Sequence, residues 1–248
     1  MRRLLVQGAS GRLGQTILRL AQQSGGWQVT ASERGARLEP LVAASEVSVD
    51  VSVPEASVQI ALLCARHGKP LVVGTTGHSD TQLKAIDSAA AVCPILVAPN
   101  FSVGVNLLFW LTRETARVLG EAFDTEVIEM HHRLKKDAPS GTAKRLAEVL
   151  ASARSTAYEK AVRHGRQGMV GQRTTEEIGV HAVRGGNIVG EHTVVFAGEG
   201  ERIELIHRAA SRDTFARGAL QAAEWLVGQS PGRYDMQDVL GLKGELCR

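Results

Sequence analysis

Short, continuously apolar runs alternate along the first hundred residues with stretches whose apolar positions recur at helical spacing. Gly, Pro or Asp bound most of the runs, as is typical of buried strands, and the runs cover residues 3–7, 27–33, 49–53, 70–76 and 94–100. The helical patterns cover residues 12–23, 55–68 and 80–91. Apolar strands that alternate with helices predict a parallel sheet with helices on both faces. We therefore expect an α/β fold whose N-terminal part is a doubly wound parallel sheet.

A different pattern follows Asn100. The next elements expected are a helix over 105–120, an alternating strand over 124–132, and a helix over 140–154 with Ser140 as its N-cap. Residues 181–209 form three extended runs separated by GGN and GEGE, which are hairpin signals. This part predicts a second, α+β domain with an open mixed sheet. A last helix is expected at about 213–228.

These elements divide the chain into two domains. The first is expected over residues 1–102, with the C-terminal segment 212–248 returning to it. The second is expected over residues 103–211. Two domains of this size each have enough volume for a hydrophobic core.

Composition excludes several classes of protein. The 248 residues are 44% hydrophobic and 22% charged, which is ordinary for a globular protein. A net charge of +3 and an aromatic content of 4% argue against a nucleic-acid partner. No apolar stretch approaches the roughly 20 residues of a membrane helix, and the run after the N-terminal arginines stops at Gln7, too short for a signal peptide. We expect neither nucleic acid nor membrane as a partner.

The three cysteines indicate the compartment. Cys64, Cys93 and Cys247 are scattered and lack CxxC spacing. Such usage is typical of a reducing compartment and offers neither a disulfide framework nor a zinc site. We expect a cytoplasmic protein with no metal site.

A glycine-rich turn follows the first strand. Gly8, Gly11 and Gly14 in GASGRLG stand at the start of the first helix, with Ser10 where the common fingerprint has its middle glycine. Glycines there let the backbone approach a pyrophosphate, and the helix start supplies free N–H groups. Glu33 ends the second strand pattern, where an acid binds a ribose hydroxyl, and Arg34 beside it suits the 2′-phosphate of NADP. The Rossmann-like turn predicts a dinucleotide, and the Glu–Arg pair predicts use of either NADH or NADPH.

Two further strands end in small or polar residues. VVGTTG and VAPNFS place Gly74, Thr75, Thr76, Ala98, Asn100 and Phe101 beyond strand ends. In a doubly wound sheet ligands bind beyond the carboxyl ends of the strands. These residues are therefore candidates for the nicotinamide end of the cofactor, although ordinary strand-to-helix loops have the same composition.

The stretch HHRLKKDAPSGTA, residues 131–143, concentrates titratable and turn-forming groups. His131 and His132 point to opposite faces in an ideal strand, so both reach one cleft only if the strand ends there. The N–H groups of Gly141 and Thr142 open a helix and suit a carboxylate. The stretch and the following turn carry five cations against one acid, Asp137, which favours a small dianion. His and Lys can then donate protons; neither zinc spacing nor a serine-nucleophile pattern is present.

These residues, taken together, resemble the dihydrodipicolinate reductase (4-hydroxy-tetrahydrodipicolinate reductase) family nearly end to end. The resemblance is carried by VQGASGRLG, VVGTTG, APNFSVGVN, IEMHHRLKKDAPSGTA, RGGNIVGEHTV, SRDTFARGAL and YDMQDVLGL. It implies NAD(P)H-dependent reduction of 4-hydroxy-tetrahydrodipicolinate, a small cyclic dicarboxylate, to tetrahydrodipicolinate in lysine and diaminopimelate biosynthesis. It also implies a dinucleotide-binding domain and a substrate-binding domain. The open sheet of the second domain is implied to pair between subunits in a homotetramer, and the enzyme is expected in the cytoplasm.

The resemblance assigns roles to individual residues. His131 is implied as the proton donor and acceptor and Lys135 as a proton donor, and Arg212 is expected to approach the site. Substrate carboxylates are implied to contact His132, Ser140, Gly141 and Thr142. The cofactor is implied to contact Gly8, Ala9, Ser10, Gly11, Arg12, Leu13, Glu33, Arg34, Gly74, Thr75, Thr76, Ala98, Pro99, Asn100 and Phe101.

The sequence departs from the family pattern at two places, and two other functions remain as alternatives. Ser10 replaces a glycine common in the family, and the interval from residue 35 to residue 48 is short, which bears on the adenine pocket. Another Rossmann-fold dehydrogenase, acting on an amino acid or semialdehyde, would turn over substrates that lack a second carboxylate. A dinucleotide sensor without catalysis would bind NADH and reduce no cyclic imine.

Overall fold

The computed structural model describes residues 1–243, and it divides into two compact units. One unit comprises Met1–Val103 and the chain from Arg212 onward, and the other comprises Gly104–Ser211. Cys247 and the end of the segment expected over 212–248 lie outside the described residues.

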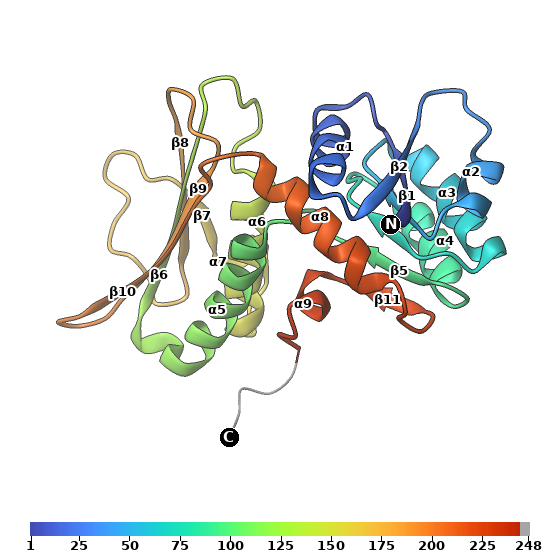
Figure 1. Ribbon diagram of the computed structural model, residues 1–248. Helices are drawn as coiled ribbons and strands as arrows, with labels where there is room; N and C mark the ends of the chain where they lie inside the picture. Colours follow the sequence, from blue (N-terminus) through green and yellow to red (C-terminus); the bar gives the residue numbers. More distant parts are fainter. Residues whose placement is uncertain (244–248) are drawn as a thin grey trace. The chain divides into compact units, whose positions relative to one another are not determined.

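A six-stranded parallel sheet forms the centre of the first unit (Figure 1). Its strand order is β11-β5-β4-β3-β1-β2. The strands are β1 (Arg2–Gln7), β2 (Trp27–Ser32), β3 (Val47–Asp50), β4 (Leu71–Val73), β5 (Pro94–Val97) and β11 (Gly232–Tyr234). The order reverses at β1, with β2 on one side of it and β3 on the other. Reversal is what makes a sheet doubly wound and creates a ligand-binding crevice at the strand ends.

Helices cover both faces of this sheet, because successive strand residues point to opposite sides. Leu4 and Val6 of β1 pack in one core cluster with residues of α1 (Arg12–Ser24) and α8 (Asp213–Leu226). Leu5 packs on the other face in a cluster with residues of α2, α3 and α4. These three helices span Leu38–Ala44, Pro54–His67 and Asp80–Ala90, and α9 spans Met236–Val239. The expectation of a doubly wound α/β sheet is confirmed.

The second unit contains a five-stranded mixed sheet in the order β10-β9-β6-β8-β7. The strands are β6 (Asp124–His131), β7 (Val162–His164), β8 (Ile178–Arg184), β9 (Glu191–Ala197) and β10 (Arg202–Arg208). Central β6 runs parallel to β8 and antiparallel to β9. The helices of this unit are α5 (Val103–Leu119), α6 (Gly141–Ala153) and α7 (Tyr158–Ala161), with a 3-10 turn, η1, at Gly120–Ala122.

The two faces of this mixed sheet differ. Val127, Val194 and Phe196 pack in one core cluster with residues of α5 and α6. Both helices lie on the same side of the sheet (Figure 1). The alternate residues of the same strands lie on the other face, where no helix of the unit packs against the described sheet. Val183 and Ile206 on that face are 43% and 46% exposed. An open sheet was expected, and the second, mixed sheet is confirmed.

The GGN signal does not form a hairpin, contrary to expectation. Strand β6 lies between β8 and β9 and separates them. The turn forms hydrogen bonds with the end of β6 instead. The Gly185 N–H donates to the carbonyl of His131, and the Arg133 N–H donates to the carbonyl of Gly186. The GEGE signal does close a hairpin, between β9 and β10.

The strand expected over 49–53 is also displaced, since β3 covers Val47–Asp50. The chain turns after Asp50, whose carboxylate accepts hydrogen bonds from the N–H and the hydroxyl of Ser52. Pro54 then begins α3, so residues 51–53 form the loop between strand and helix.

None of the described helices is long and apolar enough to cross a membrane.

Thr125 provides a stability test of the second unit. Its side chain is fully buried on the helix-covered face of β6, and its hydroxyl has no hydrogen-bond partner among the described residues. Such a hydroxyl costs about 1 kcal/mol or more. We expect Thr125→Val to raise the free energy of unfolding by about 1 kcal/mol, measured by urea titration. Thr125→Ser keeps the hydroxyl and loses the methyl group, so it should be destabilising; a valine variant no more stable than the wild type would contradict this account.

Candidate functional site

The glycine turn after β1 requires its glycines. Gly8 has a φ of +79°, and a β-carbon there would lie 2.5 Å from the carbonyl oxygen of Val51. A β-carbon at Gly14 would overlap the carbonyl oxygen of Gly8. Gly11 caps α1 without any side-chain cap, and the first turn of α1 carries no acid. The turn therefore leaves backbone N–H groups at a helix start, an arrangement that suits a phosphate.

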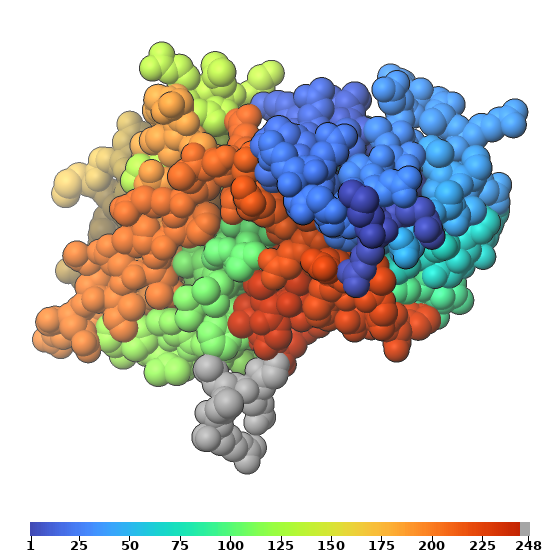
Figure 2. Space-filling view, viewed as in Figure 1, coloured from blue at the N-terminus to red at the C-terminus, as the bar shows by residue number. Residues whose placement is uncertain are grey.

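Cationic side chains surround this turn. A hollow is lined by Gly11, Arg12, Leu13, Gln15, Thr16, Arg19, Val51, Arg212 and Phe215. Helices α1 and α8 contribute most of it and lie beside each other (Figure 2). Arg19 is paired with Asp213 at 2.6 Å. Arg212, expected to approach the substrate site, is placed here beside the glycine turn, and its charge adds to the affinity of the hollow for anions.

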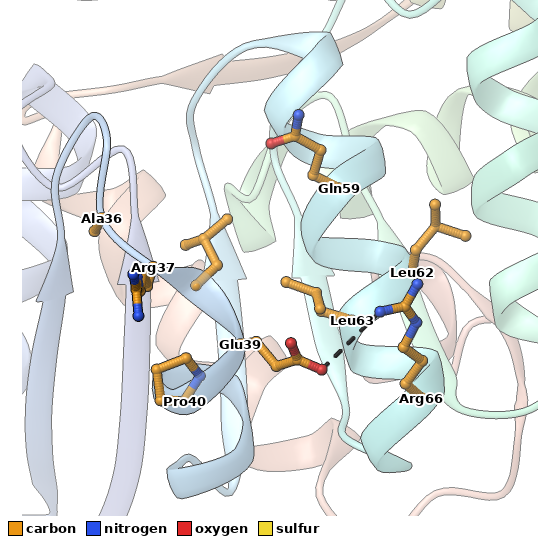
Figure 3. Close-up of a pocket in the computed structure, with 9 residues that line it drawn as sticks. Ala36, Arg37, Glu39, Pro40, Gln59, Leu62, Leu63 and Arg66 are labelled. Carbon is orange, nitrogen blue, oxygen red and sulfur yellow. Dashed lines mark ion pairs between the residues drawn. The ribbon is translucent and has the colours of Figure 1, made fainter.

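Glu33 and Arg34 are exposed in the loop that follows β2. The same loop leads into α2, and a second hollow lies between the start of α2 and α3 (Figure 3). It is lined by Ala36, Arg37, Leu38, Glu39, Pro40, Gln59, Leu62, Leu63 and Arg66. Glu39 and Arg66 approach to 4.0 Å across it. The short interval after Arg34 thus still contains a helix, which the sequence pattern did not reveal.

The loops after β4 and β5 lie side by side in the first unit. Gly74 packs under the ring of Phe101, and a β-carbon at Gly74 would overlap that ring. Thr75 is buried and its hydroxyl donates to Asp50 at 2.7 Å. Ala98 and Phe101 are also buried, whereas Thr76 and Pro99 are exposed and Asn100 is half-buried. The buried members support the backbone of these loops, and the accessible ones can contact a ligand.

Asp50 is a residue that the sequence reasoning missed. Its carboxylate is fully buried at the carboxyl end of β3 and accepts hydrogen bonds from Thr75 and Ser52. It ties the loop after β3 to the loop after β4. An acidic residue at the end of an apolar strand was the signal that could have found it.

In the second unit, β6 ends at His131 and α6 begins at Gly141. Ser140 is 2% exposed, and its hydroxyl accepts the N–H of Ala143 at 3.2 Å. The expected helix with an N-cap at Ser140 is present. Gly141 and Thr142 are the first residues of the helix, and the first turn of α6 carries no acid. The helix start can therefore bind an anion through backbone N–H groups.

His131 lies on a buried carboxylate. Its Nδ1 is 2.5 Å from Oε2 of Glu129, two residues earlier on the same face of β6. Arg184 of β8 donates to both oxygens of Glu129 at 2.8 Å, and the Ser140 N–H donates to Oε1 at 3.0 Å. The Glu129 side chain has no exposed surface. The carboxylate thus joins the end of β6, the end of β8 and the start of α6.

Opposing effects set the pKa values of this pair. Burial favours the neutral form of Glu129, but the hydrogen bonds from Arg184, His131 and Ser140 outweigh it and hold the pKa of Glu129 below its usual value. Burial lowers the pKa of His131, the hydrogen bond and charge of Glu129 raise it in part, and the charges of Lys135 and Arg184 lower it further. The net pKa of His131 is below its ordinary value, which favours the neutral imidazole.

His192 of β9 completes the buried group. Its Nε2 is 3.3 Å from the hydroxyl of Ser140, and its ring meets that of His131 edge-on with centroids 5.3 Å apart. Burial and the charge of His131 lower the pKa of His192 to about 3. His192 is therefore a neutral packing partner of His131 and Ser140 at neutral pH.

Lys135 is held at the edge of this group. Its ammonium is 2.9 Å from Asp137, and its side chain is 21% exposed. The hydrogen bond from Lys135 lowers the pKa of Asp137. Its own N–H donates to the carbonyl of His132, so the chain turns directly after β6. His132 lies just past the strand end and is half-buried.

The structure therefore brings His131, Ser140 and the helix start at Gly141 together around Glu129. Sequence reasoning missed Glu129, Arg184 and His192. The alternation of β6 could have placed Glu129 beside His131, but Arg184 and His192 reach the site through strand pairing that the sequence pattern did not predict. No group of three His, Cys, Asp or Glu side chains in the described part of the chain could hold a metal ion.

Comparison with known families gives a consistent result. Residues 2–101 match the family model described as dihydrodipicolinate reductase, N-terminus. Residues 104–240 match the model described as dihydrodipicolinate reductase, C-terminus. The two models together cover nearly the whole chain, and the resemblance noted in the sequence is confirmed.

Individual relatives agree. A 4-hydroxy-tetrahydrodipicolinate reductase of Akkermansia muciniphila is 50% identical over 240 residues, covering 96% of this chain and 98% of the relative. One of Syntrophotalea carbinolica is 45% identical over 267 residues, covering 98% of this chain and all of the relative. The structure of dipicolinate-bound dihydrodipicolinate reductase from Paenisporosarcina sp. TG-14 superposes with a TM-score of 0.79 at 25% identity, covering 96% of this chain and 98% of that one.

The neutral state of buried His192 predicts a pH dependence of stability. The unfolded chain binds a proton at this residue below about pH 6.5, whereas the folded chain does so only near pH 3. The stabilisation is therefore complete above pH 6.5 and is lost as the pH falls. From pH 7.5 to pH 5 the loss is about 2 kcal/mol. In urea titrations at the two pH values, the wild type should lose about 2 kcal/mol more than His192→Gln; equal losses would contradict the assignment.

Proposed function

Because the chain belongs to the dihydrodipicolinate reductase family, we propose that it catalyses the NAD(P)H-dependent reduction of 4-hydroxy-tetrahydrodipicolinate to tetrahydrodipicolinate in lysine and diaminopimelate biosynthesis. The observation that carries the proposal is the hydrogen bond between His131 and the buried Glu129 carboxylate, next to the open start of α6. That arrangement offers a proton-exchanging group beside an anion-binding helix start. Both are required by the reduction of a cyclic dicarboxylate.

The family is one of oxidoreductases that use a nicotinamide cofactor, and the residues of the first unit fit such a group. The turn at Gly8 and Gly14 leaves no room for side chains, and Gly11 leaves the start of α1 open to a pyrophosphate. When bound, the nicotinamide supplies a hydride. We assign cofactor contacts to the glycine turn from Gly8 to Leu13, to Glu33 and Arg34, and to the loops Gly74–Thr76 and Ala98–Phe101. Within these loops the buried Thr75 and Phe101 hold the backbone in place.

Glu33 and Arg34 suit different cofactors. A carboxylate binds the ribose 2′-hydroxyl of NADH, and a guanidinium binds the 2′-phosphate of NADPH. Because both side chains are exposed on one loop, we propose that the enzyme accepts both cofactors.

In the second unit we assign the substrate carboxylates to the N–H groups of Gly141 and Thr142 and to His132. Ser140 contributes by capping α6 and orienting its first turn, since its hydroxyl is buried. His131 and Lys135 supply the proton that follows hydride addition. The lowered pKa of His131 favours the neutral imidazole, which has one ring nitrogen free to accept a proton.

The units therefore have distinct roles. The first, over residues 1–102 and from 212 onward, binds the cofactor, and the second, over 103–211, binds the substrate and forms the oligomer. Apolar residues on the open face of the mixed sheet, among them Val183 and Ile206, are exposed. Exposed apolar sheet faces favour association with another subunit, and we propose a homotetramer that works in the cytoplasm.

A coupled assay tests the proposed reaction. The substrate would be made in place from pyruvate and aspartate semialdehyde by a synthase, and nicotinamide absorbance would be followed with NADH and with NADPH. We expect oxidation of both cofactors, dependent on the synthase and on this protein. The ratio of the two rates reports what Glu33 and Arg34 select. Cofactor binding by folded protein without any oxidation would instead favour a dinucleotide sensor.

Lys135 provides a test of the proton-transfer assignment. General acid catalysis contributes about 10²–10⁴-fold, so Lys135→Ala should lower kcat by that order while the protein stays folded. The neighbouring Lys136 is exposed, and Lys136→Ala is the matched control, expected to keep kcat within about twofold of the wild type. Wild-type turnover in Lys135→Ala would remove Lys135 from the reaction.

A further inference from the structure

Among the described residues, the hydrogen-bond partners of the buried Glu129 carboxylate are Arg184, the Ser140 N–H and Nδ1 of His131. Oε1 accepts from the Ser140 N–H and from Arg184, and Oε2 accepts from Arg184 and lies 2.5 Å from Nδ1 of His131. The side chain has no exposed surface. Because an ionised carboxylate is acceptor-only, Nδ1 of His131 must carry its proton toward Glu129. The free nitrogen of the imidazole is then Nε2.

We propose that Glu129 is the positioning residue of His131: its carboxylate, clamped by Arg184 and the Ser140 N–H, fixes the imidazole so that Nε2 is the nitrogen that exchanges the proton. The proposal rests on the assignment of His131 to proton transfer. In the transfer His131 is protonated and carries a hydrogen on each ring nitrogen. The Nε2–H bond breaks, its electron pair stays on the imidazole, and the proton goes to the ring carbon of the enamine that hydride addition leaves. The ring is then neutral and keeps its Nδ1–H toward Glu129. Solvent returns a proton to Nε2 afterwards.

The surroundings of Nε2 support this orientation. Gly190 precedes β9, and a β-carbon there would lie 3.0 Å from Nε2 and 3.4 Å from Cδ2 of His131. The backbone at Gly190 is tied down, because its carbonyl accepts the N–H of Ala209. Any side chain at position 190 would therefore crowd Nε2. The edge-on contact with His192 holds the ring from a third element.

Groups on four elements set the charge around the ring. Glu129 on β6 favours the protonated form of His131, whereas Arg184 on β8 and Lys135 on the following loop oppose it. His192 on β9 is neutral, since its pKa is lowered to about 3. Asp137 faces Lys135 and partly balances its charge. Loss of the Glu129 charge should thus lower the pKa of His131, and activity that needs protonated His131 should be lost at a lower pH.

Replacement of Glu129 by Gln has a specific consequence. An amide nitrogen at the Oε1 position would face two donors, the Ser140 N–H and Arg184. At the Oε2 position it faces one donor of Arg184 and can donate to Nδ1 of His131. The second orientation is the less costly, and it moves the imidazole proton from Nδ1 to Nε2. Replacement of an orienting carboxylate by its amide can lower turnover by up to about 10⁴-fold.

The experiment combines NMR with kinetics on the full-length enzyme. Histidines labelled with ¹⁵N report the tautomer of His131, whose signals are identified by their absence in His131→Gln. We expect the Nδ1–H form in the wild type and the Nε2–H form in Glu129→Gln. The variant should lose at least about tenfold in kcat, with little change in KM for NADH, and the alkaline limb of its kcat–pH profile should shift to lower pH.

Two further variants separate positioning from general damage. Thr125→Val alters a buried residue on the same face of β6 without touching the His131 group, and it should keep the wild-type tautomer and pH profile. Gly190→Ala should lower kcat while keeping the Nδ1–H tautomer, and it tests the proposal even if Glu129→Gln does not fold.

The outcomes distinguish the proposal from its premise. A wild-type Nε2–H tautomer, or wild-type kcat and pH profile in folded Glu129→Gln, would overturn the proposal. If the wild-type enzyme reduced no substrate, the proposed function would fail, but the tautomer measurement would still decide how Glu129 holds His131.

Discussion

The hydrogen bonding of the buried Glu129 carboxylate is the constraint on which the second unit depends. An ionised group without solvent contact is tolerated only when hydrogen bonds replace its hydration. Arg184, His131 and the Ser140 N–H provide them from three different segments of the chain. Satisfying this one group therefore fixes where β6 ends, how the loop of residues 132–140 returns, and where α6 starts. The position of the His131 imidazole and the open start of α6 are two consequences of the same constraint.

The first unit uses a related solution. Asp50 is buried at the carboxyl end of β3, and its carboxylate bonds to Thr75 and Ser52 in the neighbouring loops. Glycines at positions 8, 14 and 74 let backbone or aromatic atoms lie where a side chain would otherwise stand. In both units the loops beyond the strand ends are held by buried acids and close backbone contacts. Glu33, Arg34 and Thr76 remain exposed in the loops of this unit.

The sequence predicted what is encoded locally. Apolar periodicity located β1, β2, β4, β5 and most of the longer helices, and the DAPSGTA turn located the capped start of α6. The sequence pattern did not predict which strands pair with one another. The GGN turn was predicted as a hairpin, but β6 inserts between β8 and β9 and pairs with both of them. For the same reason Arg184 and His192, on those two strands, were not predicted as neighbours of His131, and the short α2 and α7 have too few residues for a clear periodic signal.

The most direct test of the account is a crystal structure of the enzyme with dipicolinate, a planar ring that carries two carboxylates. We predict one carboxylate within hydrogen-bond distance of the backbone N–H groups of Gly141 and Thr142, with the ring beside Nε2 of His131 and with Nδ1 still on Glu129. Binding elsewhere on the chain, or an imidazole turned away from Glu129 in the complex, would contradict the account.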